Sequence, residues 1–329
     1  MFVGFRNATL PAAALRFALA LMLCFSFGFA TPAFGQSAEL NRYEYKARHM
    51  GIVARVVVYA EAEADALAGA RAAFSRIEAL EAVFSNYRVD SEVALLARAP
   101  TGTRVGVSAD LLRVMLRSDM LWRESGGAFD VTVGSLSQLW REAISRGELP
   151  DTVAIARARA STGWRHVALD AAAQTVTIRR PGIVMDFGAI AKGFAADEAL
   201  RVLRGRGLSR ALVELGGDIV VGNPPPGEDG WVIDGAEFGG AKQLVVANAG
   251  VSTSGDSQQH VVVDGIRYSH IVDPRTGVGL TNGVTVTLVA RDGLTSDGLS
   301  TTVSVMGEAA GRALAERVFP DAEVFVHER

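Results

Sequence analysis

The chain has a single cysteine among its 329 residues, Cys24, and this residue lies in an apolar N-terminal segment. We expect that segment to be removed, so the mature protein would have no disulfide, no thiolate metal ligand and no cysteine nucleophile. Basic residues do not outnumber acidic ones, 33 against 36, and the formal net charge is −3. This balance argues against nucleic acid as a partner, because nucleic-acid binders usually show a basic excess.

The N-terminal segment has the pattern of a secretory signal peptide. Basic residues precede an apolar run at 17–30, and Ala33-Phe34-Gly35 places small residues where a signal peptidase reads them. We therefore expect residues 1–35 to be a signal peptide, the mature chain to begin near Gln36, and the protein to be periplasmic. The alternatives are an uncleaved anchor, for which the run is short, and a lipid anchor at Cys24, which a large residue precedes.

The rest of the chain contains no internal repeat, no low-complexity tract and no regular βαβ succession, which indicates an α+β fold. Apolar residues at helical spacing, with capping residues, predict helices at 63–84, 108–124, 151–160, 190–204, 294–306 and 308–318. β-Branched and apolar runs predict strands at 43–60, 165–169, 175–179, 183–185, 211–215, 219–221, 231–233, 243–247, 260–263, 268–272, 284–290 and 321–326. The proline-rich segment 223–227 is the one plausible internal break, and we interpret it as a surface loop.

The segment 184–197 carries the clearest sign of a binding site. Apolar residues lead from a predicted strand to Asp186, a turn of small residues follows, and Lys192 stands at the start of a predicted helix. The N-terminus of a helix offers unpaired N–H groups and the positive end of the dipole to an anion. With the charge of Lys192 beside them, these groups predict a phosphate site.

A second segment offers oxygen ligands for a metal. If residues 294–306 are helical, Asp297 and Thr301 lie four residues apart on one face. A carboxylate and a hydroxyl, completed by carbonyl and phosphate oxygens, suit Mg²⁺. The alternative is that Asp297 caps the helix and that Thr301 packs against its surroundings.

His270 is the histidine with a functional setting, because a predicted strand delivers it to the turn 273–277. A histidine side chain can take a proton from an alcohol near neutral pH, although a structural, hydrogen-bonded histidine is the alternative. Two polar turns, 215–218 and 253–256, could let the backbone approach a ligand, or they could be an ordinary hairpin and β-turn. The turns at 84–92 and 126–134 could line a ring-shaped ligand or simply be capped turns.

In their order along the chain, these segments resemble the ApbE family of FAD:protein FMN transferases. The resemblance covers roughly residues 43 to 326. It rests on Met50-Gly51, Phe84-Ser85-x-Tyr87-x-x-x-Ser91-Glu92, Gly127-Ala128-Phe129-Asp130-x-Thr132, Asp186-Phe187-Gly188-Ala189-Ile190-Ala191-Lys192-Gly193, Leu215-Gly216-Gly217-Asp218, Thr253-Ser254-Gly255-Asp256, His270-Ile271-Val272-Asp273-Pro274-Arg275-Thr276-Gly277 and Asp297-x-x-Ser300-Thr301.

The resemblance implies a flavin transferase fold with mixed or antiparallel sheets and packed helices over residues 36–329. It implies transfer of FMN from FAD to a threonine or serine hydroxyl of another protein, with release of AMP and a need for Mg²⁺. The implied metal ligands are the Asp297 carboxylate, the Thr301 hydroxyl and the backbone oxygen of Ala189. Lys192 would face the pyrophosphate, and His270 would activate the acceptor hydroxyl. The implied FAD contacts are Met50, Tyr87, Ala128, Phe129, Asp130, Lys192 and Ile271.

The expected partner is a periplasmic or membrane-attached acceptor flavoprotein of a respiratory or redox complex. Two other functions stay open: an FAD pyrophosphatase that makes FMN and AMP, and a non-catalytic flavin carrier. The chain departs from the family pattern at Ile52, where threonine is usual, at 257–260, where a tyrosine and an arginine are missing, and at Gly298, where alanine is commoner. These departures leave the metal residues intact and bear on flavin contacts and on the choice of acceptor.

Overall fold

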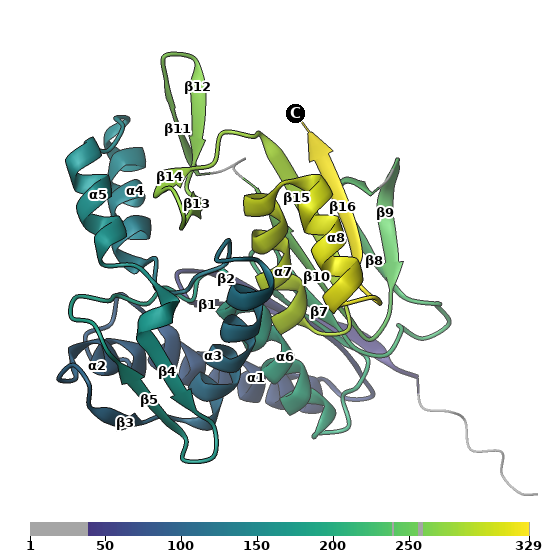
Figure 1. Ribbon diagram of the computed structural model, residues 1–329. Coiled ribbons are helices and arrows are strands. Elements are labelled where there is room, and N and C mark those ends of the chain that lie inside the picture. The colour runs from purple at the N-terminus through teal and green to yellow at the C-terminus, as the bar shows by residue number, and fades with distance from the viewer. Residues whose placement is uncertain (1–38, 239, 256–258, 329) are drawn as a thin grey trace, which may run out of the picture. The chain divides into compact units, whose positions relative to one another are not determined.

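A seven-stranded sheet lies at the centre of the computed structural model, which describes residues 39–238, 240–255 and 259–328 (Figure 1). The spatial order of its strands is β1-β2-β6-β7-β10-β15-β16, and every neighbouring pair is antiparallel. The strands are β1 Asn41–His49, β2 Ile52–Ala60, β6 Ala211–Leu215, β7 Asp218–Val221, β10 Ala249–Ser254, β15 Val284–Ala290 and β16 Glu323–Glu328. The sheet, with the helices packed on it, confirms the α+β class.

Alternate residues of the central strands enter different cores, as the period of a strand requires. On β2, Val56 and Val58 pack into the main core with the helices, whereas Val57 packs on the opposite face of the sheet. The longer helices of the main core are α1 Glu63–Phe84, α3 Ala109–Glu124, α6 Ala191–Arg204, α7 Gly293–Met306 and α8 Glu308–Val318. The opposite face is covered by the hairpin of β8 Trp231–Phe238 and β9 Ala241–Val246.

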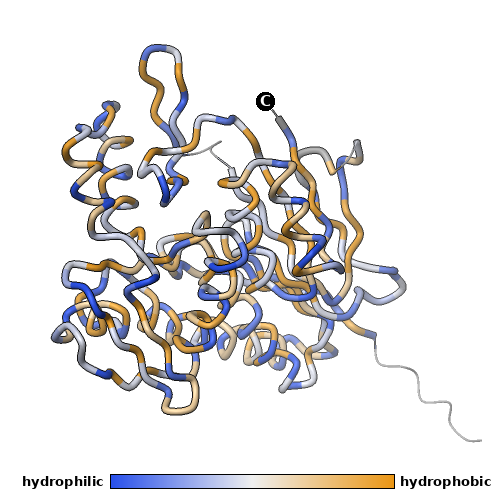
Figure 2. Tube along the Cα trace, in the orientation of Figure 1, coloured by the Kyte–Doolittle hydropathy of each residue, from blue (hydrophilic) through white to orange (hydrophobic). Residues whose placement is uncertain are grey.

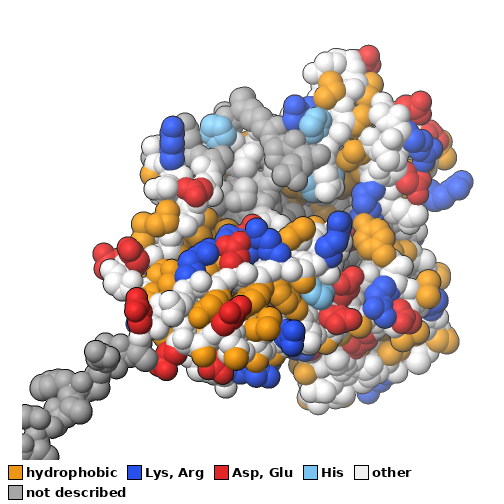
Figure 3. Space-filling model, turned by 180° about the vertical axis from the view of Figure 1, so that it is seen from behind, with side chains coloured by type: hydrophobic (Ala, Val, Ile, Leu, Met, Phe, Trp, Pro, Cys, Tyr) orange, Lys and Arg blue, Asp and Glu red, His pale blue; other side chains and the backbone are white. Residues whose placement is uncertain are grey.

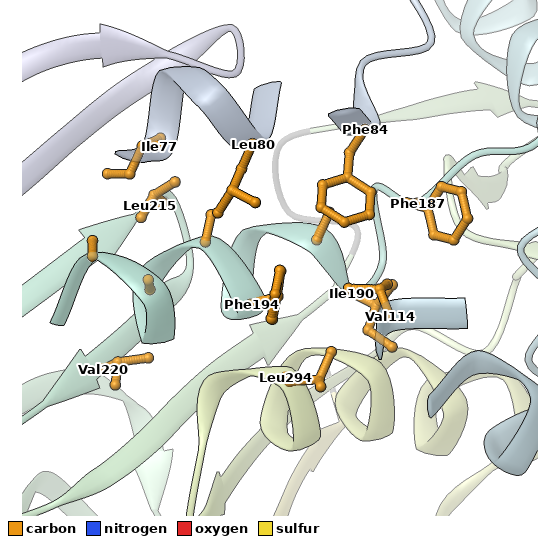
Figure 4. Packing of buried hydrophobic residues seen from close by; sticks show 14 of the residues in the cluster. Ile77, Leu80, Phe84, Val114, Phe187, Ile190, Phe194, Leu215, Val220 and Leu294 are labelled. Atoms are coloured by element: carbon orange, nitrogen blue, oxygen red, sulfur yellow. The ribbon is translucent and has the colours of Figure 1, made fainter. Parts of the chain in front are cut away.

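Three phenylalanines join the end of α1 to the start of α6 (Figure 4). The ring of Phe84 lies 5.5 Å from that of Phe187 and 5.9 Å from that of Phe194, edge to face in both pairs. All three side chains are buried. Aromatic pairs of this geometry add about 0.5–1.5 kcal/mol each to the stability that burial provides. They fix the loop before α6 against the helices, which matters because this loop carries the predicted phosphate site.

Smaller elements surround this core. A three-stranded sheet has the order β3-β5-β4, and two short hairpins, β11-β12 and β13-β14, pack against α4 through Leu136, Trp140, Val261 and Val272. Hydrophobic and hydrophilic residues are interleaved along the β11-β12 hairpin (Figure 2). The elements are α2 Glu92–Arg98, β3 Arg104–Gly106, α4 Gly134–Arg146, α5 Thr152–Ala160, the 3₁₀ turn η1 Trp164–His166, β4 Val167–Asp170, β5 Thr175–Ile178, β11 His260–Val263, β12 Ile266–Ser269, β13 Val272–Asp273 and β14 Val278–Gly279.

All the predicted helices are present, within a residue or so of their expected ends. The single strand predicted at 43–60 is wrong, because Met50 and Gly51 form a tight turn that divides it into β1 and β2. The strand predicted at 183–185 is also wrong: Val184 makes one isolated bridge, to Val133. The helices α2 and α4 were not predicted. The segment 223–227 is a loop between β7 and β8, inside the single compact unit Glu39–Arg329.

The predicted signal peptide lies outside the described residues. Within them, no helix combines the length and the apolar character needed to cross a bilayer. Acidic and basic side chains are interleaved, not sorted by sign, on the face seen from behind in Figure 3. Ion pairs also join opposite charges on strands of the large sheet, for example Glu44 with Arg42 and Lys46 on β1, and Arg55 on β2 with Glu214 on β6.

Candidate active site

A cavity of about 790 Å³ brings together residues from both ends of the chain. Its walls come from the β1-β2 turn, the loop after α1, the segment before α4 with the first turns of α4, the loop before α6, the β6-β7 turn, the end of β10, the segment after β12 and one face of α7. This volume lies within the usual range of ligand sites. Every site residue predicted from the sequence lines the cavity: Met50, Tyr87, Ala128, Phe129, Asp130, Ala189, Lys192, His270, Ile271, Asp297 and Thr301.

Two buried carboxylates and one lysine form the most strongly charged part of the cavity. Asp218, in the β6-β7 turn, and Asp297, on α7, are 2% and 3% exposed. Lys192, in the first turn of α6, forms an ion pair and a hydrogen bond with Asp218. Burial lowers the pKa of Lys192, but the charges of Asp218 and Asp297 outweigh this effect, so its pKa is raised overall and it stays charged. The cluster therefore carries one negative charge in excess when both acids are ionised.

That excess makes Asp297 costly to ionise. Burial raises its pKa to about 7, and the neighbouring charge of Asp218 adds to the rise while Lys192 opposes it. A buried charge without a full partner is unfavourable, and a cation brought into the cluster would relieve it. The charge balance thus fits a divalent cation bound together with an anion.

The oxygens around Asp297 also fit a magnesium ion. The Gly193 N–H, whose partner in a regular helix would be the Ala189 carbonyl, donates to Asp297 Oδ2 at 2.9 Å. The Ala189 carbonyl and the Thr301 hydroxyl line the same cavity, and Thr301 Oγ1 lies 3.1 Å from Ser254 Oγ. Across the part of the chain that the structure describes, no group of three or more His, Cys, Asp or Glu side chains could hold a metal. Mg²⁺ does not require one, since it is commonly bound by one or two carboxylates, waters and substrate phosphates.

The interpretation of Asp297 as the cap of its own helix is wrong. The N-cap of α7 is Asp292, whose Oδ1 accepts a hydrogen bond from Thr295 N at 2.7 Å. Asp297 lies one turn further along and accepts its hydrogen bond from α6 instead. It is therefore available to the cavity.

Met50 lines the cavity from a strained position. Its φ of 51° is left-handed, and Gly51 follows with a φ of 75°, which together are typical of a two-residue hairpin turn. A left-handed residue with a side chain costs about 1–2 kcal/mol, so it needs support from its surroundings. Glu81, on α1, provides this support, because its Oε2 accepts a hydrogen bond from Met50 N at 2.8 Å.

Tyr87 lies at the cavity mouth, 77% exposed, in the loop between α1 and α2. The guanidinium of Arg141, from α4, lies 5.4 Å from the centre of its ring. Arg141 also pairs with Asp186 at 3.0 Å, and Asp186 Oδ1 accepts a hydrogen bond from Gly188 N at 2.9 Å. Arg141 thus connects an exposed ring to the loop that precedes α6.

The carboxylate of Asp130 holds the wall of the cavity in place through hydrogen bonds to two neighbouring segments. Its Oδ1 accepts hydrogen bonds from Thr132 N and Thr132 Oγ1 at 2.8 and 2.6 Å, and its Oδ2 accepts one from Trp164 N at 3.0 Å. Burial raises the pKa of Asp130, although these hydrogen bonds oppose the rise. Its neighbours Ala128 and Phe129 are buried. The carboxyl group of Asp130 is therefore already fixed in position on the cavity wall before a ligand binds.

His270 follows directly after β12, where the chain bends before β13, so the strand predicted at 268–272 is wrong at this position. Its Nδ1 lies 3.1 Å from the carbonyl oxygen of Gln259, and its backbone N–H donates to the same oxygen at 3.1 Å. A carbonyl only accepts, so Nδ1 carries the proton and Nε2 is the basic atom of the ring. Ile271 lines the cavity beside it.

Known proteins match this chain in sequence and in structure. A model of the ApbE family matches residues 50–326. The chain belongs to the ApbE family. A Treponema pallidum (strain Nichols) protein named FAD:protein FMN transferase is 30% identical over 318 residues, which cover 88% of each chain. A Vibrio cholerae serotype O1 protein of the same name is 32% identical over 250 residues, which cover 73% of this chain and 74% of the relative.

Solved structures of ApbE proteins have the same fold. The flavin transferase ApbE from Vibrio cholerae superposes with a TM-score of 0.76 at 28% identity, covering 87% of this chain and 93% of that one. The apo form of the Pseudomonas stutzeri flavinyl transferase ApbE gives 0.77 at 29% identity, covering 88% and 92%. These matches confirm the family and the fold expected from the sequence. The relatives are named as flavinyltransferases, which is the enzyme class expected from the sequence.

Several residues of the ApbE site were not identified as functional from the sequence. Asp218 was read as part of a Gly-Gly turn, which it is, but its carboxylate pairs with Lys192. Glu81 and Arg141 lie on helices with nothing nearby in the sequence to distinguish them from surface charges. Ser254 ends strand β10 and contacts Thr301, whereas Asp256, from the same predicted turn, lies outside the described residues.

Proposed function

We propose that this protein is a Mg²⁺-dependent FAD:protein FMN transferase of the periplasm. It would move the FMN part of FAD to a threonine or serine hydroxyl of an acceptor flavoprotein and release AMP. The carrying observation is the single cavity that joins the carboxylate and lysine cluster at Asp297 and Lys192 to the basic nitrogen of His270. The names of the ApbE relatives support the proposal.

The diphosphate of FAD would lie at the start of α6. The helix N-terminus and Lys192 offer positive charge there, and this charge stabilises the negative charge that builds up on the leaving phosphate. Asp218 keeps Lys192 charged and oriented. A bound Mg²⁺, held by Asp297, Thr301 and the Ala189 carbonyl, would add Lewis-acid stabilisation of the phosphate oxygens.

His270 would serve as the base for the acceptor. Its Nε2 takes the proton of the acceptor hydroxyl while the hydroxyl oxygen attacks the phosphorus of the FMN half. The bond between that phosphorus and the bridging oxygen breaks, and the electrons leave with AMP. Gln259 holds the ring in the tautomer that this step requires. No covalent intermediate with the enzyme is needed.

The test uses the chain from Gln36 onward with FAD, Mg²⁺ and a purified acceptor domain. We expect flavin fluorescence that survives SDS electrophoresis, and a mass increase of the acceptor equal to one FMN residue. EDTA should abolish both, and an acceptor that lacks its hydroxyl should stay unmodified. AMP release at the same rate without acceptor would indicate a pyrophosphatase, and tight FAD binding without any AMP would indicate a carrier.

Two variants test the assigned roles. His270→Ala should slow transfer by about 10²–10⁴-fold, the usual contribution of a general base, while FAD still binds. Asp297→Asn should remove the Mg²⁺ dependence together with most of the activity. Asp234→Asn, an exposed carboxylate on β8, is the matched control and should leave the rate unchanged. Wild-type rates in both site variants would refute the assignments.

The periplasmic location rests on the sequence of residues 1–35. Expression of the full chain with cell fractionation should yield a shortened protein in the periplasmic fraction, with an N-terminus near Gln36. A full-length protein that stays with the membrane would contradict the cleaved signal.

A further inference from the structure

Helices α6 and α7 meet through backbone contact at two glycines. A Cβ added to Gly193, in the first turn of α6, would lie 2.0 Å from the carbonyl oxygen of Gly293. A Cβ added to Gly293, the first residue of α7, would lie 2.4 Å from the carbonyl oxygen of Gly193. No side chain fits between the two helix ends, so the position of one sets the position of the other.

Each glycine is followed, four residues later, by an aspartate that binds the opposite helix. Asp297, on α7, accepts the hydrogen bond from Gly193 N at 2.9 Å. Asp197, on α6, accepts hydrogen bonds from Gly293 N and Leu294 N at 2.7 and 2.8 Å. The two carboxylates thus satisfy N–H groups that the helix termini leave unpaired, each at the start of the other helix.

The two carboxylates differ in what else they face. Asp297 lines the cavity and is the proposed metal ligand, whereas Asp197 is not among the lining residues. The capping of α7 does not depend on Asp197 alone, because Asp292 accepts a hydrogen bond from Thr295 N. What Asp197 adds is a connection between the start of α7 and the helix that carries Lys192.

We propose that Asp197 is a positioning residue for the metal site, an inference that rests on the proposed function. By holding Gly293 and Leu294 against α6, it sets where Asp297, one turn further along α7, lies relative to the Ala189 carbonyl. Residues that orient a metal ligand without binding the metal themselves commonly contribute about 10–100-fold to metal affinity, because they hold the ligand in the binding geometry.

The experiment compares Asp197→Asn with Asp292→Asn. Each substitution keeps the size of a side chain that binds the N-terminus of α7 and removes one of its carboxylate oxygens. Of the two, only Asp197 reaches across to α7 from α6. Asp292 caps α7 and pairs with Arg117 and Arg291, so Asp292→Asn is the control for loss of contacts that do not join the two helices. Asp197→Glu keeps both oxygens on a longer side chain and provides a second test should the asparagine variant fold poorly.

The principal measurement is the affinity of the protein–FAD complex for Mg²⁺ by calorimetry, with melting temperature and steady-state kinetics alongside. We expect Asp197→Asn to weaken Mg²⁺ binding about 10–100-fold, and high Mg²⁺ to restore most of its kcat. Asp197→Glu should be intermediate. Asp292→Asn should lower the melting temperature at least as much, because it weakens the cap and the ion pairs with Arg117 and Arg291, but it should leave Mg²⁺ affinity within about twofold of wild type, because none of these contacts joins α7 to α6.

The outcomes separate this inference from the proposed function. Equal Mg²⁺ affinities in Asp197→Asn, Asp292→Asn and the wild type would overturn the positioning role and leave the function intact. Equal losses in the two variants would reduce Asp197 to an ordinary cap. Absence of Mg²⁺ binding by the wild-type FAD complex would overturn the proposed function and this inference together.

Discussion

Replacing Gly193 by alanine tests whether the contact between α6 and α7 holds the site together. The new Cβ would lie 2.0 Å from the carbonyl oxygen of Gly293, and contacts under 3.0 Å are essentially never found. The two backbones must therefore separate by at least 1.0 Å, the difference between these distances. The Cβ of Asp297, 2.7 Å from the new atom, moves with them.

The expected energies follow from what each Cβ meets. At Gly193 the obstacle is backbone, which cannot rotate away, so we assign the upper end of the overpacking range, about 3 kcal/mol. Alanine regains at most about 1 kcal/mol through its helix propensity, which leaves a net loss of about 2 kcal/mol. Gly298→Ala is the matched control, because its Cβ would meet only the side-chain ends of Leu121 and Ile190, at 2.7 and 3.1 Å. Those ends can turn, so the net change there should be near zero.

Urea unfolding of both variants gives the free energies, and the acceptor assay gives the rates. A displacement of about 1 Å at a reacting centre costs up to roughly 10²-fold, so Gly193→Ala should lose about that much transfer activity. Gly298→Ala, which restores the residue commoner in the family, should transfer FMN at nearly the wild-type rate. The reasoning is refuted if Gly193→Ala is as stable as Gly298→Ala, or if it transfers FMN within a few-fold of wild type.

Three further predictions concern charged side chains. Lys192→Met leaves two buried carboxylates without their cation and should lower the free energy of unfolding by about 1–3 kcal/mol. This is less than for a fully buried ion pair, because the side chain of Lys192 is 31% exposed. Mg²⁺ should raise the melting temperature of this variant more than that of the wild type. Glu81→Ala removes the acceptor of Met50 N, a bond to a charged group worth about 1.5–3 kcal/mol, and should weaken FAD binding, whereas the exposed Glu78→Ala should not. Burial raises the pKa of Asp197 to about 7, above its ordinary 3.8, so its protonation stabilises the fold fully below about pH 4 and progressively less as the pH rises towards 7. Melting curves should show this slope in the wild type and a flatter one in Asp197→Asn; identical slopes would contradict it.

Helices were the part of the fold that local sequence specified best. The helix predicted at 63–84 has these bounds in the structure, Ser108 caps α3, and the helix expected to start at Asp151 begins one residue later with Asp151 as its cap. Capping and apolar spacing act within a few residues, so they can be read without knowing the rest of the fold. The unpredicted α4 carries the same signal, since Leu136, Trp140 and Ala143 are buried on one face and Gly147 ends it in a left-handed conformation.

Strands were harder to delimit, because a strand exists only where another strand pairs with it. The run at 43–60 is rich in strand-forming residues on both sides of Met50, yet Met50 itself adopts a left-handed turn that its side chain disfavours. The hydrogen bond from Met50 N to Glu81, on another element, supports this turn. In the opposite sense, the apolar run at 183–185 has a strand composition and makes only one bridge.

The amino-acid sequence alone determined which chemical groups this protein brings to its site, in what order, and which family it resembles. Only the tertiary structure decided which of those groups act on one another: Lys192 on Asp218, Asp297 on the start of α6, and Asp197 on the start of α7. These partners lie 26, 104 and 96 residues apart. The physical reason is that a carboxylate's charge and hydrogen-bonding capacity are properties of the residue, whereas its partner and its pKa depend on the burial and neighbours that folding creates.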